Sequence, residues 1–318
     1  MPNTDCFPYS DVQKFSRVTL LGKEVELKNY VCSPDGVHYR SKVGQIRLQL
    51  SILLTRFCDA ACPFCIAAPT DDPRVLDLGA LEKVLLLLRK EDRVRGISIT
   101  GGEPFSQMEV LNEAVSMIFR IFGYAMEITI DTNGTGLGHL RGIRDLAHVD
   151  TVHISRHHWL DRKNEKLFGR PMPSGEELRE AIASVGIRDL FVLNCMLLRG
   201  YVETPEDAHR YMDFAIDTGA GKVSFITGTP VNAFVREKRV IYEDVLRAGD
   251  PSLLFTRGFQ DGTYCRCQDG VYVSPCGQLM EFYGRHSEPG GCAYCRGLVL
   301  TPDGTLMAGF GSPVLYQA

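Results

Sequence analysis

Three cysteines in one short segment have a spacing that suits metal chemistry. Cys58, Cys62 and Cys65 lie within the eight residues "CDAACPFC". Structural zinc sites usually take four ligands from two C-x2-C pairs, and this segment contains one such pair. Three thiolates can instead hold three corners of a 4Fe–4S cube, which leaves the fourth iron open to a small-molecule ligand. We therefore expect an iron–sulfur cluster here, and a zinc site completed by more distant cysteines is the alternative.

The other cysteines and the lack of targeting signals point the same way. The chain has 11 cysteines in 318 residues, and its N-terminal residues lack the apolar core of a signal peptide. The sequence has no run of about 18 apolar residues, so it predicts no membrane span. We expect a cytoplasmic protein whose grouped cysteines bind metal rather than form disulfides. Cys6, Cys32 and Cys195 stand alone and are interpreted as structural thiols.

The composition argues against a nucleic-acid-binding surface. The net charge is -4, the isoelectric point is about 6.1, and 44% of the residues are hydrophobic. A surface that neutralises phosphates needs an excess of basic residues, which this chain lacks. A nucleotide remains possible as a small substrate.

Residues 46–228 alternate between short β-branched runs and amphipathic helical patterns. The predicted strands are "IRLQLSILLT", "GISITG", "EITIDT", "TVHIS", "LFVLNCMLL" and "KVSFIT". Two of the intervening helices have clear starts, because Ser174 precedes Glu177 by three residues and Thr204 precedes Pro205. Six strands that alternate with helices predict an α/β fold, an incomplete (β/α)6 TIM-like barrel with a parallel sheet.

Polar signatures directly follow the predicted strands. "CDAACPFC", "TGGEP", "DTNG", "SRHH" and "RG" come after the first five strands in turn. In barrels of this kind the chemistry lies at the carboxyl ends of the strands. We therefore expect these segments to meet at one end of the barrel.

The two ends of the chain lie outside this pattern. Residues 1–45 are predicted to form an N-terminal extension. Its extended pieces "RVTLLGKEVELKNYV" and "GVHYRSKVGQ" are read as a strand pair, or as a strand and a loop. Residues 229–318 begin with "VREKRVIYEDVLRAGD", read as one helix, and continue into a region rich in Cys and Gly. Pro302-Asp303-Gly304 predicts a hairpin turn. We expect residues 229–318 to form a small Cys-rich subdomain that holds a metal group.

The order of two motifs resembles the radical S-adenosylmethionine (SAM) superfamily. C-x3-C-x2-C follows the first strand and G-G-E-P, Gly101 to Pro104, follows the second. The resemblance covers about residues 46–228. It implies that Cys58, Cys62 and Cys65 hold a catalytic 4Fe–4S cluster whose open iron binds SAM. A reduced cluster would then cleave SAM, and the 5′-deoxyadenosyl radical would abstract hydrogen from a substrate. A flavodoxin- or ferredoxin-like protein is the expected electron donor.

The resemblance also implies residues that contact SAM. Gly101 and Gly102 would let the backbone approach the ligand, and Glu103 would accept a hydrogen bond from its ammonium group. Further expected cofactor contacts are Phe64, Thr132, Asn133, Ser155 and Leu197. Phe64 and Leu197 have ordinary core packing as their alternative.

Three polar positions near the fourth and fifth strands have open interpretations. Arg156 is expected to pair with a carboxylate or phosphate of SAM or substrate. Asn194 either faces the barrel interior, where it would touch SAM or substrate, or lies in the core. His157 and His158 are acid–base groups, anchors, or part of a solvated loop that caps the following helix.

The C-terminal cysteines resemble the auxiliary-cluster segment of the GTP 3′,8-cyclase branch. Cys292 and Cys295 match its C-x2-C pair, but Gly309 stands near the position of its third cysteine. Cys265 or Cys267, together with Cys276, would complete four ligands, as in the shortened Twitch domain of other radical SAM enzymes. A second 4Fe–4S cluster is therefore expected, with zinc or no metal as alternatives. Of the basic residues that hold the nucleotide in that branch, only Arg296 is present, so the resemblance does not imply the same substrate.

We expect a radical SAM enzyme that acts on a small polar or nucleoside-like molecule. The alternatives are a maturase that modifies a peptide or protein, and a non-catalytic iron–sulfur or zinc scaffold or sensor.

Overall fold

The computed structural model describes most of the chain. The described ranges are residues 15–28, 48–65, 72–228, 230, 232–247, 249–255, 270–285, 297–309 and 313–318. Several residues singled out in the sequence lie outside them: Cys6, Cys32, Cys265, Cys267, Cys292, Cys295 and Arg296.

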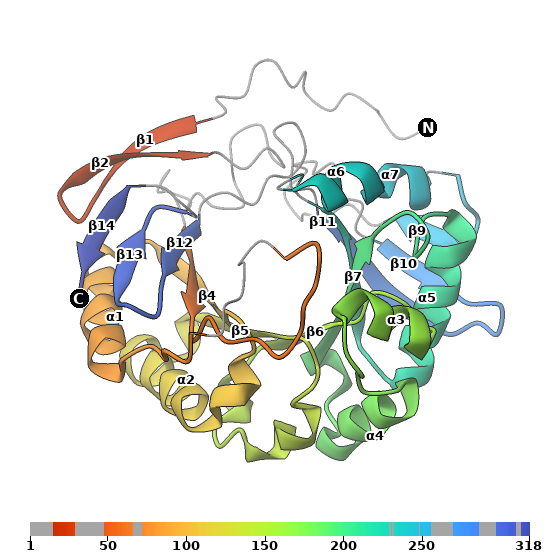
Figure 1. Cartoon of the computed structure of the whole chain (residues 1–318), viewed down its shortest axis with the longest axis horizontal. Coiled ribbons are helices and arrows are strands. Elements are labelled where there is room, and N and C mark those ends of the chain that lie inside the picture. The colour runs from red at the N-terminus through yellow and green to blue at the C-terminus, as the bar shows by residue number, and fades with distance from the viewer. Residues whose placement is uncertain are drawn as a thin grey trace.

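Six parallel strands form the centre of the fold and confirm the predicted α/β partial barrel. They are neighbours in chain order: β3 (Leu48–Leu53), β4 (Val94–Thr100), β5 (Glu127–Thr132), β6 (Thr151–Ser155), β7 (Phe191–Leu197) and β8 (Lys222–Thr227). The helices between them are α1 (Leu78–Glu91), α2 (Met108–Phe122), α3 (Asp161–Phe168), α4 (Gly175–Val185) and α5 (Pro205–Thr218). Short 3-10 helices cover Pro104–Gln107, Gly123–Ala125, Leu137–Gly142, Leu146–His148 and Arg188–Leu190. Figure 1 shows the strands as an arc with the helices on its outside.

The predicted helix starts are confirmed. Ser174 and Glu177 form a reciprocal capping box at α4. Thr204 caps α5 with Asp207 as its partner, Pro205 occupies the first turn, and Gly219 ends the helix in the left-handed conformation.

The two faces of the sheet differ in polarity. On β5 to β8, every second residue packs into the main hydrophobic core with the helices, for example Ile130, Ile154, Leu193 and Phe225. The residues between them point to the inner face of the arc, because successive side chains of a strand alternate. They include Thr129, Asp131, Thr151, His153, Ser155, Asn194 and Ser224. The interior of the barrel is therefore lined by hydrogen-bonding groups.

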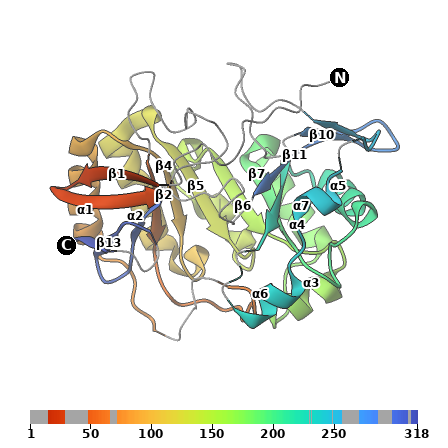
Figure 2. The same cartoon turned by 90° about the horizontal axis from the view of Figure 1, so that it is seen from above.

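The described strands after residue 228 join both edges of the barrel sheet. β11 (Leu279–Arg285) pairs in parallel with β8, and β10 (Gly270–Val273) and β9 (Leu253–Phe255) continue that edge. β12 (Gly297–Leu300) pairs in parallel with β3, followed by β13 (Thr305–Met307) and β14 (Val314–Gln317). The result is a 12-stranded sheet within the described ranges, and Figure 2 shows its two C-terminal portions on opposite sides. A domain boundary at residue 228 stays a prediction.

Turn and helix predictions outside the barrel had mixed outcomes. β12 and β13 form the hairpin predicted from Pro302-Asp303-Gly304, and Gly304 has a φ of 80°. The single helix predicted for "VREKRVIYEDVLRAGD" was wrong, because α6 (Ala233–Lys238) and α7 (Tyr242–Val245) are separate. Between them Arg239 forms a β-bridge with Leu198, and this pairing takes the backbone out of the helical conformation.

The N-terminal extension contains a strand pair formed mainly by the first of its two extended pieces. β1 (Phe15–Leu20) and β2 (Lys23–Lys28) form an antiparallel hairpin that is separate from the large sheet. Leu20 and Val25 pack into the main core. The second extended piece, "GVHYRSKVGQ", lies outside the described residues.

None of the helices in the described ranges has the length and apolar character needed to cross a membrane.

The packing of β11 on the barrel predicts an effect of Gly284→Ala. A Cβ at Gly284 would lie 2.8 Å from ring atoms of the fully buried Tyr242. We expect this overpacking to lower the free energy of unfolding by about 1–3 kcal/mol, in a single transition that includes the barrel. The measurement is urea unfolding followed by circular dichroism and tyrosine fluorescence.

Gly297→Ala is the matched control, because a Cβ there would meet nothing within 4 Å. An equal loss in both variants, or a separate transition for the C-terminal strands, would contradict the structure.

Candidate active site

A buried carboxylate joins the carboxyl ends of β4 and β5. Glu103 is 1% exposed. Its Oε1 accepts hydrogen bonds from the Phe105 N–H at 3.0 Å and the Thr132 hydroxyl at 2.7 Å, and its Oε2 accepts from the Asn133 N–H at 2.7 Å. A carboxylate has about four acceptor positions, so one position on Oε2 is left for a further donor.

The two glycines before Glu103 let the backbone of the cysteine loop pack directly on this turn. The Gly102 N–H donates to Thr55 O at 2.8 Å, and the Glu103 N–H donates to Phe57 O at 2.9 Å. A Cβ at Gly102 would lie 1.7 Å from Phe57 O, and Gly101 has a φ of 131°. Glycine is therefore required here by the approach of the protein's own loop.

The loop that follows β3 brings the three cysteines of the C-x3-C-x2-C motif together as free thiols. Cys58 Sγ accepts from the Ala60 N–H at 3.5 Å and lies 3.8 Å from Asn133 Nδ2. Burial, with the neighbouring thiols of Cys65 and Cys58, raises the pKa of Cys62 to about 12. Iron binding requires thiolates, so loading of this loop must release protons.

Neighbouring elements hold the loop on the barrel. Asn133 Nδ2 donates to the Asp59 carboxylate at 2.7 Å, so the residue that contacts Glu103 also contacts the loop. Arg170 pairs with the same carboxylate and donates to Asp59 O at 3.0 Å. The Ala61 N–H donates to Phe168 O at 2.8 Å.

The arrangement fits a cube better than a single ion. Within the described ranges no group of three or more His, Cys, Asp or Glu residues is placed to hold one metal ion. In a cube each thiolate binds a different iron, so the three thiols need not converge on one point. The remaining acceptor position of Glu103, beside the loop, suits an ammonium group of a small ligand.

His157 is a buried structural ring beneath the cysteine loop. Its ring contacts Phe64 edge-on, with centroids 4.8 Å apart, and stacks on Phe168 at 5.1 Å. Its Nδ1 accepts from the Met196 N–H at 3.1 Å, so Nε2 carries the proton of the neutral ring. Burial lowers the pKa of His157 to about 3. Burial likewise lowers the pKa of His158 to about 4. His157 is 3% and His158 is 0% exposed, so neither histidine belongs to a solvated loop.

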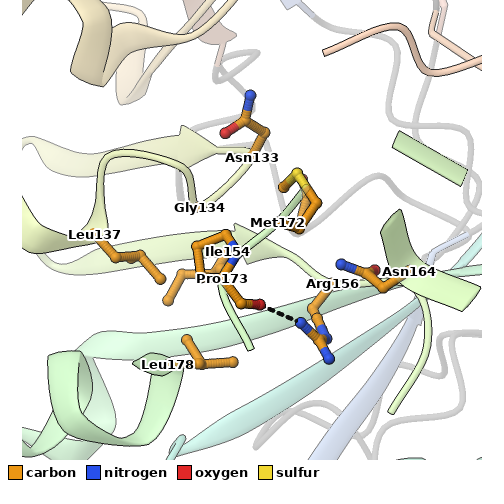
Figure 3. Close-up of a pocket in the computed structure, with 10 residues that line it drawn as sticks. Asn133, Gly134, Leu137, Ile154, Arg156, Asn164, Met172, Pro173 and Leu178 are labelled. Atoms are coloured by element: carbon orange, nitrogen blue, oxygen red, sulfur yellow. Dashed lines mark hydrogen bonds between the residues drawn. The ribbon is translucent and has the colours of Figure 1, made fainter. Parts of the chain in front are cut away.

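The guanidinium of Arg156 braces the segment after β6. It donates to the carbonyls of His158, at 2.9 Å, and Pro173, at 2.6 Å, and it pairs with the Asp161 carboxylate. Figure 3 shows it turned toward the Pro173 carbonyl beside a small pocket that Asn133, Ser155 and Asn164 also line. This geometry favours a structural role for Arg156 over the predicted pairing with SAM or substrate.

The strand β7 residues have distinct positions. Asn194 lies on the inner face and is 5% exposed, as one of its two interpretations expected. Leu197 is fully buried in the core on the helix side, so the prediction that it contacts SAM is not supported. Met196 is the inner-face residue of this stretch. Cys195 is a fully buried thiol, as predicted.

A polar network on the inner face was missed by the sequence analysis. The Ser98 hydroxyl donates to Asp131, and His153 Nδ1 lies 3.1 Å from Asp131 Oδ1. A carboxylate only accepts, so the His153 Nδ1 carries the proton and Nε2 is the basic nitrogen. The sequence signal that could have revealed this network is a polar residue at every second position of three successive strands.

Cys276 lies far along the sheet from the cysteine loop. It is exposed in the turn between β10 and β11, where Ser274 Oγ is 3.1 Å from its Sγ. β11 runs parallel to β8, so this turn precedes the amino end of the parallel sheet. The loop with Cys58 follows the carboxyl end of β3, which is the opposite end.

Comparison with known proteins identifies the class. The model of the radical SAM superfamily matches residues 52–215, just over half of the chain. The chain therefore belongs to the radical SAM superfamily. It is an enzyme of that superfamily, whose members use a 4Fe–4S cluster and SAM and require a reductant and a substrate.

Curated relatives are similar over most of their length. The probable GTP 3′,8-cyclase of Metallosphaera sedula is 25% identical over 283 residues, which cover 83% of this chain and 81% of the relative. That of Saccharolobus solfataricus is 26% identical over 277 residues, 83% of both chains.

Solved structures share the fold. Streptococcus suis SuiB bound to S-adenosylmethionine matches with a TM-score of 0.56 and 16% identity, over 84% of this chain and 62% of that chain. SuiB bound to the precursor peptide SuiA matches with a TM-score of 0.55 and 16% identity. This chain thus spans less than two thirds of SuiB.

Gly102→Ala is predicted to disrupt the cysteine loop. The added Cβ would clash with Phe57 O at 1.7 Å, so the loop must move away from the Glu103 turn. We expect a loss of more than about 2 kcal/mol in unfolding free energy and several-fold less bound iron after anaerobic reconstitution. Gly138→Ala, where a Cβ meets nothing within 4 Å, is the control and should retain its iron. Normal iron content in the Gly102 variant would contradict the described contact.

The buried Glu103 predicts a pH dependence of stability. Burial raises its pKa from 4.5 to about 7, so the folded state binds this proton more tightly than the unfolded state. The stabilisation is fully present below pH 4.5 and is lost as the pH rises through about 7, a fall of about 3 kcal/mol. We expect Glu103→Gln to remove this slope in urea unfolding of the iron-free chain between pH 5 and 8.

Glu109→Gln, at an exposed position of α2, serves as the control. An unchanged pH slope in Glu103→Gln would show that the carboxyl does not titrate in this range.

Proposed function

We propose that the chain binds its catalytic cluster through Cys58, Cys62 and Cys65 and uses SAM to abstract hydrogen from a small polar substrate in the barrel. The observation that carries the proposal is the Glu103 junction. One buried carboxylate connects the ends of β4 and β5, and Asn133 extends this connection to Cys58 and Asp59.

The junction provides the binding groups that such a reaction needs. Glu103 accepts a hydrogen bond from the SAM ammonium through the remaining position on Oε2. Thr132 and Asn133 hold that carboxylate in place. Ser155 lines the small pocket next to Asn133 and offers its hydroxyl to SAM.

Phe64 and the buried rings behind it shape the apolar side of the site. Phe64 packs on His157, which Phe168 supports from the other side. This stack holds Phe64, which lies between Cys62 and Cys65, against the barrel. When bound, a reduced 4Fe–4S cluster supplies the electron that cleaves SAM to the 5′-deoxyadenosyl radical. A flavodoxin- or ferredoxin-like protein is the proposed source of that electron.

A small polar substrate is supported by the inner face of the sheet. Hydrogen-bonding residues of β4 to β8 line it, and the Ser98, Asp131 and His153 network lies among them. The alternative is a peptide substrate, because the fold is similar to that of SuiB, which has been solved with a precursor peptide. Membership in the superfamily leaves the non-catalytic scaffold as the weakest alternative.

An auxiliary 4Fe–4S cluster remains part of the proposal, but Cys276 is no longer among its proposed ligands. Cys265, Cys267, Cys292 and Cys295 supply four thiolates, the number that a closed cube takes. Cys276 is not needed in this set. Cys276 lies in the turn after β10, whereas Cys265 and Cys267 precede that strand in the sequence, so the whole of β10 lies between them.

The proposal is tested by anaerobic reconstitution followed by reduction in the presence of SAM. We expect about eight irons per chain and release of 5′-deoxyadenosine. Replacing Cys58, Cys62 and Cys65 together by alanine is expected to remove about four irons and all 5′-deoxyadenosine. Retention of 5′-deoxyadenosine formation in the triple variant would refute the assignment of the catalytic cluster.

Cys276→Ala is predicted to keep its iron. Its side chain is exposed in the turn between the antiparallel strands β10 and β11, whereas the other candidate cysteines precede β10 or follow β11, so we expect that its loss removes no ligand. Cys292→Ala, in contrast, is expected to lower the content by about four irons per chain. Iron analysis and visible absorption measure both variants. A similar loss of iron from Cys276→Ala would return this residue to the ligand set.

A further inference from the structure

Two buried polar atoms on neighbouring strands have no hydrogen-bond partner among the residues that the structure describes. They are Asn194 Oδ1 on β7 and Ser224 Oγ on β8. Asn194 is 5% exposed and Ser224 is 0% exposed. Buried polar groups are normally satisfied, and leaving one unpaired is destabilising. Two such groups side by side therefore need an explanation.

Both atoms belong to the inner face of the barrel. The residues on either side of each of them, Leu193 and Cys195 on β7 and Val223 and Phe225 on β8, pack into the core with the helices. Asn194 and Ser224 are direct register partners. Strand neighbours in a sheet lie about 4.8 Å apart, so one small chemical group can reach both side chains.

The row continues with polar residues on both sides. Ser155 of β6 is the register partner of Asn194, and Tyr283 of β11 is the register partner of Ser224. Two residues toward the amino ends of these strands, Lys222 of β8 and Glu281 of β11, pair with each other at 3.0 Å. The two unpaired atoms are themselves uncharged, one an amide oxygen and the other a hydroxyl oxygen.

From this geometry we propose that Asn194 Oδ1 and Ser224 Oγ form a subsite for a neutral hydroxyl or carboxamide group of the substrate. A hydroxyl or amide N–H donates to Asn194 Oδ1. The Ser224 hydroxyl pairs with the oxygen of the same group or of an adjacent one. This deepens the proposed function, because it places the substrate against β7 and β8.

The subsite adjoins the residues that are proposed to contact SAM, of which Ser155 on β6 is the nearest, but it does not include Glu103. The Glu103 junction ties the ends of β4 and β5, whereas Asn194 and Ser224 lie within β7 and β8. We therefore assign different residues of the inner face to SAM and to the substrate. Unpaired polar groups that serve a ligand lower the stability of the ligand-free protein, as sites built for binding commonly do.

The test replaces the unpaired groups and measures stability and SAM binding separately. Ser224→Ala and Asn194→Leu remove the unpaired atoms with little change in volume. We expect each to raise the midpoint of thermal unfolding of the reconstituted, substrate-free enzyme by about 1–4 °C. We expect the dissociation constant for SAM, measured by equilibrium dialysis, to change less than about twofold.

Ser98→Ala is the matched control on the same face, because its hydroxyl donates to Asp131. It should lower the unfolding midpoint. A lower midpoint in Ser224→Ala would show that its hydroxyl is satisfied within the protein and would overturn the subsite. A tenfold or greater loss of SAM affinity in either variant would assign the pair to SAM and also overturn it. If the wild-type enzyme releases no 5′-deoxyadenosine, the proposed function fails, while the stability results still decide the subsite.

Discussion

The burial of the Glu103 carboxylate is the constraint on which the site depends. A charge that is removed from water must be compensated by hydrogen bonds, and three donors from the turn itself and from β5 do this. Those bonds determine where β4 and β5 end relative to each other. The same turn accepts the backbone of the cysteine loop, which only glycine at position 102 allows. The turn that carries this carboxylate thus helps to position the three thiols, together with the contacts of the loop to Phe168 and Arg170.

The barrel framework is shared with proteins whose names indicate different substrates. The curated relatives are named as cyclases and the structural relative SuiB has been solved with a peptide, yet all share much of the chain or fold. The framework therefore does not determine the substrate. The inner face of β4 to β8 carries the side chains that a substrate in the barrel would meet. Its unpaired atoms on β7 and β8 and its Asp131–His153 pair are chemical features that an apolar barrel core would not need.

Local sequence patterns predict much of the fold. Most of the site residues that were misassigned or missed depend on the direction in which a side chain points. Strand order, the capping box at Ser174 and the hairpin at Asp303 are set by nearby residues, so the sequence predicts them. Leu197 was assigned to SAM from the resemblance, but strand alternation turns it toward the helices. Arg156 was assigned to the ligand from its place after a strand, but the carbonyls of His158 and Pro173 and the Asp161 carboxylate take up its guanidinium. Asp131 and His153 were missed because their pairing is visible only once β5 and β6 are neighbours.

The central claim is that three thiols leave one iron open and that SAM fills it beside Glu103. Electron–nuclear double resonance on the reduced, reconstituted enzyme tests this directly when the amino group of SAM carries ¹⁵N. The account predicts a ¹⁵N coupling to the cluster of Cys58, Cys62 and Cys65 that is lost or strongly weakened in Glu103→Gln. A cluster that shows no ¹⁵N coupling in the wild-type enzyme with SAM bound would contradict it.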